Sequence, residues 1–174
     1  MNLMVEITST IGGESNLKEI LKNSWWKVPI YCIITGWITF QLEVYIGGSF
    51  LITTLPNGAI ATNTTNWFII QGIWFCAALI GGSLCFRRMS KQELFCSASV
   101  MVLFNILGGL IVHFFQSVVP LGGIYAQASN WTGWIHQVVC NIGINPWVGV
   151  VLAWAIPYLF VFFGKRTHEG GVIK

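Results

Sequence analysis

Four long apolar runs, separated by short polar segments, organise this sequence. Each run contains about 20 residues, which is the length that an α-helix needs to cross a hydrocarbon core of about 30 Å. The runs cover residues 28–48, 67–86, 94–116 and 146–163. The pattern predicts an all-α integral membrane protein. Its simplest arrangement is an antiparallel bundle of four transmembrane helices.

The polar segments between the runs contain helix-start and turn signals. Ser90-Lys91-Gln92-Glu93 is a capping box, which predicts the start of the third transmembrane helix. Asn145-Pro146 predicts a capping residue followed by proline at the first position of the fourth helix. Pro56-Asn57-Gly58 predicts a turn in the loop formed by residues 49–66.

Two shorter segments have the pattern of surface helices. Residues 1–27 are predicted to be a cytoplasmic segment with a short helix on the membrane surface. Residues 130–143 have apolar side chains at helical spacing, so an amphipathic helix is predicted to lie flat on the outer surface. A re-entrant segment is the alternative there. The membrane domain then covers residues 28–166, and residues 167–174 form a cytoplasmic tail.

Composition and charge support this interpretation. The 174 residues are 55% hydrophobic and 9% charged, and the mean hydropathy is +0.69. Soluble domains carry about 25% charged residues, so lipid is expected to surround much of this chain. All nine Lys and Arg residues fall in the N-terminal segment, in residues 87–91 or in residues 165–174. The positive-inside rule therefore predicts that both termini are cytoplasmic, in a plasma or inner membrane.

Each apolar run has one stripe of small or polar side chains at helical spacing. Helices in lipid associate through such stripes, because small residues allow the backbones to approach closely. The stripes contain Cys32, Gly36, Thr39, Glu43 and Gly47; Gln71, Ala78, Gly82 and Cys85; Asn105, Gly108, Gly109, His113 and Gln116; and Gly149, Ala153 and Pro157. These faces are predicted to point inward, with a kink at Pro157.

Three polar side chains are predicted to lie at nearly one depth, close to the outer surface. Glu43 is the one acidic residue inside an apolar run, and Gln71 and His113 belong to two other runs. Intramembrane ionisable residues are candidates for function, and pairing Glu43 with His113 would lower the cost of burying a charge. We therefore treat Glu43, His113 and Gln71 as a hypothetical pocket for a cation, a proton or a small polar ligand. A structural hydrogen-bond pair is the alternative.

The sequence contains no signature of catalysis. It has no Asp, no motif of a hydrolase, metalloprotease or nucleotide-binding loop, and its five cysteines include no CxxC pair. We predict no catalytic residue, no metal site and no cofactor, and the dispersed basic residues do not predict a nucleic-acid partner.

The expected function is accordingly that of a non-enzymatic accessory or interaction protein. Its expected partners are the lipid bilayer and either another membrane protein or further copies of itself. The alternative is a small transporter or channel that uses the Glu43, His113 and Gln71 pocket.

Overall fold

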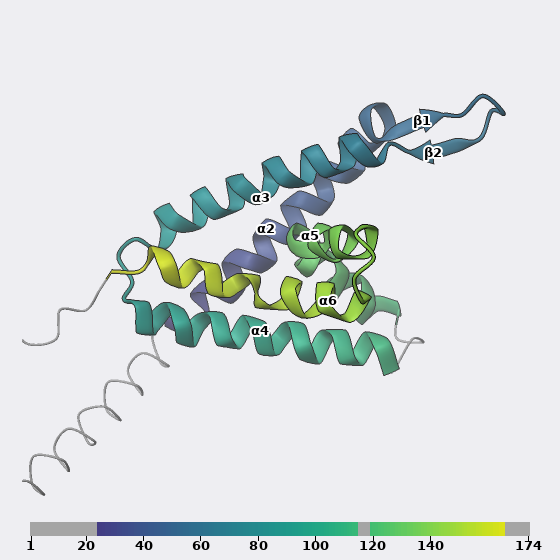
Figure 1. Cartoon of the computed structure of the whole chain (residues 1–174). Coiled ribbons are helices and arrows are strands. Elements are labelled where there is room, and N and C mark those ends of the chain that lie inside the picture. Colours follow the sequence, from purple (N-terminus) through teal and green to yellow (C-terminus); the bar gives the residue numbers. More distant parts are fainter. Residues whose placement is uncertain (1–23, 115–118, 166–174) are drawn as a thin grey trace, which may run out of the picture.

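The computed structural model describes residues 24–114 and 119–165. Within these ranges, the helices are α2 (Lys27–Ile46), α3 (Thr64–Phe86), α4 (Lys91–Phe114), α5 (Val119–Asn141) and α6 (Pro146–Ala155) (Figure 1). Helix α2 continues into a π-helical turn, η1 (Gly47–Leu51), and α6 continues into a 3-10 helix, η2 (Ile156–Phe163). Strands β1 (Ile52–Thr54) and β2 (Ile60–Thr62) connect α2 to α3. Most of the expected N-terminal surface helix and all of the expected C-terminal tail lie outside the described residues.

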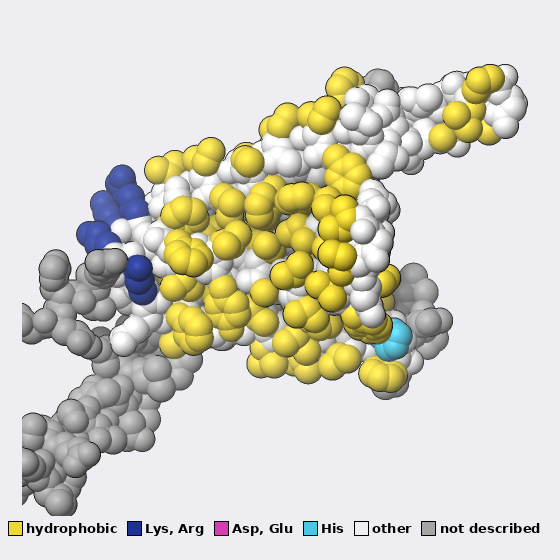
Figure 2. All heavy atoms as spheres, viewed as in Figure 1, with side chains coloured by type: hydrophobic (Ala, Val, Ile, Leu, Met, Phe, Trp, Pro, Cys, Tyr) yellow, Lys and Arg dark blue, Asp and Glu magenta, His cyan; other side chains and the backbone are white. Residues whose placement is uncertain are grey.

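The prediction of four long apolar helices is confirmed. Among the described residues, four helical segments are long and apolar enough to cross a membrane, namely α2, α3, α4 and the continuous segment of α6 and η2. Figure 2 shows apolar side chains over the middle of the molecule and Lys and Arg side chains gathered at one end. The hairpin of β1 and β2 projects from the other end.

The local signals for helix starts are also confirmed. The Ser90 backbone N–H donates to Glu93 Oε2 at 2.7 Å, and the Glu93 backbone N–H donates to Ser90 Oγ at 3.2 Å. This reciprocal pair is the predicted capping box. Asn145 Oδ1 accepts a hydrogen bond from the Trp147 backbone N–H at 3.0 Å, so Asn145 caps α6 as expected. Asn63 caps α3 in the same way, by accepting from the Asn66 backbone N–H at 3.1 Å.

The fifth helix differs from the prediction. The amphipathic segment was expected at residues 130–143 on the outside of the bundle, but α5 begins at Val119 and packs against α2 and α6 in the interior. Its Trp131 is only 2% exposed and belongs to the apolar core together with Val28 and Phe160. The view in Figure 1 runs close to the axis of α5, whereas α3, α4 and α6 extend across the page.

The predicted stripes are largely correct for α2 and α6. Cys32, Gly36 and Thr39 are buried on α2. Gly149 and Ala153 are buried on α6, as is Pro157 at the start of η2. On α3, Gln71, Ala78 and Gly82 are buried, but Cys85 is exposed because Phe86 takes the inward position. The 3-10 geometry begins beside Pro157, where proline removes a backbone hydrogen bond, in agreement with the predicted irregularity.

The segment between α2 and α3 is a β-hairpin rather than an irregular loop. Strands β1 and β2 pair antiparallel, with Ile52 opposite Thr62 and Thr54 opposite Ile60. The predicted turn is present, and Gly58 adopts a φ of +78°, a left-handed conformation that glycine tolerates without steric cost. The all-α description therefore needs one correction, the addition of this two-stranded sheet.

Candidate functional site

The carboxylate of Glu43 is held between three helices. Trp67 Nε1, from α3, donates to Glu43 Oε1 at 2.9 Å, and Gln71 Nε2, one turn further along α3, donates to the same oxygen. Asn130 Nδ2, from α5, donates to Glu43 Oε2 at 2.8 Å. Each of these donors is neutral, so the negative charge is stabilised by hydrogen bonds rather than by ion pairing.

The elements around Glu43 explain how the chain builds this site. Glu43 lies in the last turn of α2, and the backbone N–H of Gly47 still closes a helical hydrogen bond to the Glu43 carbonyl. The helix then widens into η1, whose buried Leu51 lies at the base of the hairpin. A π-helical turn is a rare geometry that often occurs at functional sites.

Two of the four groups at this site could be predicted from the sequence. Glu43 and Gln71 meet as their stripe positions suggested. Trp67 was missed, although it precedes Gln71 by four residues and must therefore lie on the same face of α3. Asn130 was also missed, because α5 was placed on the outside of the bundle and its polar residues were assumed to face water.

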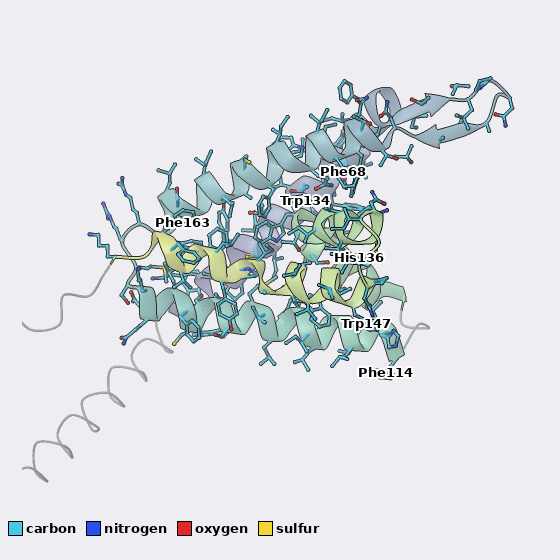
Figure 3. All side chains as sticks on the ribbon, in the orientation of Figure 1. Phe68, Phe114, Trp134, His136, Trp147 and Phe163 are labelled. Atoms are coloured by element: carbon cyan, nitrogen blue, oxygen red, sulfur yellow. The ribbon has the colours of Figure 1, made fainter. Side chains whose placement is uncertain are left out.

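The predicted pairing of Glu43 with His113 is wrong, because no hydrogen bond joins them and Glu43 bonds Trp67, Gln71 and Asn130 instead. His113 is exposed near the end of α4, and its ring contacts Trp147 edge to face with ring centres 5.5 Å apart. Figure 3 shows Trp147 beside Phe114 at this corner of the molecule.

Helix α5 explains the separation, since it packs against both α2 and α4 near the level at which they were expected to meet. A Cβ at Gly36 of α2 would lie 2.3 Å from the carbonyl oxygen of Ala128 in α5. A Cβ at Gly108 of α4 would lie 2.5 Å from the Tyr125 ring, which also belongs to α5.

An open pocket lies next to Trp67, one of the residues that bond Glu43. Its volume is about 270 Å³, and it is lined by Thr62, Thr64, Trp67 and Gln137. Trp67 is shared by the pocket and the Glu43 site. Its indole N–H donates to Glu43, and the residue also lines the pocket. The pocket therefore lies between the base of the hairpin and the Trp67 side chain that bonds the carboxylate.

Two side-chain oxygens within the bundle are buried and have no hydrogen-bond partner. They are Oε1 of Gln71 and Oδ1 of Asn105. Gln71 is 1% exposed, and its unpaired oxygen belongs to the same amide group whose nitrogen bonds Glu43. Asn105 lies in the middle of α4, on the stripe that was predicted to point inward, and it is buried. Buried polar atoms are nearly always paired, so the unpaired Gln71 oxygen beside a carboxylate is unusual.

The described residues contain no group of three or more His, Cys, Asp or Glu side chains that could hold a metal ion. The five cysteines are free, and Cys32 is buried in the core. The chemistry available at the Glu43 site is that of one carboxylate with the amide and indole groups that bond it.

These features define a class: a helical protein with four segments apolar enough to cross a membrane and a carboxylate held by neutral donors between three helices. No protein-family model matches the chain, and neither a curated protein nor a solved structure matches it. The proposals below rest on the residues and contacts of this chain.

Proposed function

We propose that the chain is a non-enzymatic membrane protein that binds another protein through the hairpin of β1 and β2. One observation carries this proposal: the hairpin exposes large apolar side chains at the end of the molecule opposite its basic residues. Ile60 is 74% exposed, and Ile52 and Leu55 are also exposed. Exposed apolar groups outside a lipid-covered surface favour an interaction site.

The geometry of the hairpin supports a protein partner. Ile52 and Ile60 lie on the same face, because Ile52 and Thr54 are two residues apart on β1 and Thr54 pairs with Ile60. Residues 50–66 contain no charged side chain. The sheet has only two strands, so each strand leaves one edge free. The free N–H and C=O groups of an uncharged edge strand can pair with another chain.

The positions of the basic residues indicate on which side of the membrane the hairpin is expected to lie. Arg87, Arg88, Lys91 and Lys165 lie at the opposite end, together with Lys27 at the start of α2. Under the positive-inside rule the hairpin faces the outer side, with both termini cytoplasmic. The partner is then a protein that presents an apolar surface or a free strand on that side.

The alternative, a small transporter or channel, has less support. It depended on a pocket formed by Glu43, His113 and Gln71 for a cation, a proton or a small polar solute, and only Glu43 and Gln71 meet. The hydrogen bonds of Glu43 go to Trp67, Gln71 and Asn130. That arrangement is equally suited to fixing three helices together.

Native mass spectrometry of the tagged full-length protein in mild detergent tests this function. The expected result is a second polypeptide at a fixed ratio, which is lost when Ile60→Lys places a charge on the apolar face. Thr53→Lys is the matched control, because Thr53 is exposed on the same hairpin but points to the opposite face. A partner that is retained by Ile60→Lys, a homo-oligomer or the protein alone would overturn the proposal.

A further inference from the structure

We propose that Glu43, Gln71 and Asn130 form a binding site for one monovalent metal cation, which reaches the site through the pocket beside Trp67. This inference does not depend on the hairpin partner. It starts from the buried Gln71 Oε1, which has no hydrogen-bond partner although its amide group directly faces a carboxylate.

The amide groups at this site can present either of two atoms to Glu43. The nitrogen of Gln71 faces Glu43 Oε1, and the nitrogen of Asn130 faces Glu43 Oε2 at 2.8 Å. Rotation of an amide by half a turn exchanges its nitrogen for its oxygen, and this terminal torsion is broad and roughly two-fold. Gln71 and Asn130 can therefore hold the Glu43 carboxylate in either of two ways. With their N–H groups turned inward they bond the bare carboxylate. With their oxygens turned inward they can bind a cation that lies against the carboxylate.

The orientation with N–H groups leaves Gln71 Oε1 buried and unpaired, which costs free energy. A bound cation would favour the rotated amide, because Oε1 would then face the ion as a ligand, while the amide nitrogen would take the position that Oε1 occupies here. Two carboxylate oxygens and two amide oxygens would then supply a partial shell of hard oxygen ligands, which is the type that alkali and alkaline-earth ions take. The remaining ligands would be water molecules from the pocket.

The charge at the site favours a monovalent ion. Glu43 supplies one negative charge, and its partners Trp67, Gln71 and Asn130 are neutral. One carboxylate balances one positive charge, whereas a divalent ion would keep an uncompensated charge in a partly buried site.

The pocket provides access to this site. Thr62, Thr64 and Gln137 line the pocket. Their hydroxyl and amide groups are of the kind that can replace part of the hydration shell of an entering ion. Trp67 stands between the pocket and the carboxylate, with its indole N–H on Glu43 Oε1 at 2.9 Å. An entering ion would displace this donor or pass beside it.

The experiment is thermal unfolding of the full-length protein in mild detergent, with LiCl, NaCl or KCl replacing N-methyl-D-glucamine chloride at constant ionic strength. For the wild type, the apparent Tm is expected to rise with one of these cations and to saturate, with a total shift of roughly 5 °C. Glu43→Gln is expected to abolish the shift. Glu93→Gln is the matched control, because Glu93 belongs to the capping box of α4 and is expected to keep the response.

A second variant keeps the test decisive if Glu43→Gln does not fold. Gln71→Met keeps the length of the side chain but removes the amide oxygen, and it should raise the cation concentration for half-maximal shift by about tenfold or more. An unchanged half-maximal concentration in this variant would overturn the proposal. So would a wild-type Tm that responds to none of the three cations, or that responds to pH alone.

Discussion

Replacing Gly36 by alanine is expected to destabilise the bundle by about 2 kcal/mol. The added Cβ would lie 2.3 Å from the carbonyl oxygen of Ala128 and 2.6 Å from that of Gln127. Both atoms belong to the backbone of α5, so no side chain can rotate away, and α2 and α5 must separate. Overpacking of this kind costs about 3 kcal/mol at the upper end of its usual range. The higher helix propensity of alanine offsets about 1 kcal/mol of this destabilisation.

The matched control is Gly72→Ala on α3. No atom lies within 4 Å of a Cβ added at Gly72, so no steric clash offsets the gain in helix propensity there. We expect this variant to be neutral or stabilised by up to about 1 kcal/mol. The measurement is the fraction of monodisperse protein remaining after a temperature series, by fluorescence-detected size exclusion. Equal effects of the two substitutions would show that the contact between α2 and α5 does not limit stability.

The features that could be predicted from the sequence are those determined by neighbouring residues. Ser90 and Glu93 form the capping box because the two groups are three residues apart at a helix start. Gly149 and Ala153 are buried on one face of α6 because they are four residues apart. Helix length and apolarity follow from the same local information.

The position of α5 could not be predicted, because it depends on contacts between distant segments. An amphipathic helix can place its apolar face either on lipid headgroups or inside a bundle, and its periodicity is the same in both cases. Here the apolar face of α5 packs on other helices, where Trp131 stacks on Phe75 and on Phe160. The error about α5 led directly to the error about Glu43, since Asn130 of α5 and not His113 meets the carboxylate.

The hairpin shows a different limit of local patterns. Pro56-Asn57-Gly58 predicted a turn, but the flanking residues 52–54 and 60–62 are short and rich in threonine. An isolated hairpin is at most marginally stable in water, so its sequence alone is a weak signal. Contacts with the helices support it here: Asn66 Nδ2 donates to the Phe50 carbonyl at 3.0 Å, and the Asn63 backbone N–H donates to the Leu51 carbonyl at 2.7 Å.

The largest effect is expected for Phe160→Ala, with a loss of about 3 kcal/mol. Phe160 is 0% exposed, and its ring contacts Tyr31 of α2, Phe86 of α3 and Trp131 of α5, with ring centres 5.6, 5.2 and 5.9 Å apart. Truncation removes one ring that joins three helices to η2 and leaves a cavity. The loss is placed at the lower end of the usual range, because the measurement is made in detergent, whose apolar tails rather than water would surround the unfolded side chain.

Phe162→Ala is the matched control, since it removes the same side chain from the same 3-10 helix. Phe162 is 76% exposed, so its ring meets the surroundings of the bundle in the folded state as well. We expect its loss to change stability by less than about 0.5 kcal/mol. Thermal unfolding of both variants in one detergent measures the difference. A Phe160→Ala protein as stable as Phe162→Ala would mean that the aromatic cluster does not hold η2 against α2, α3 and α5.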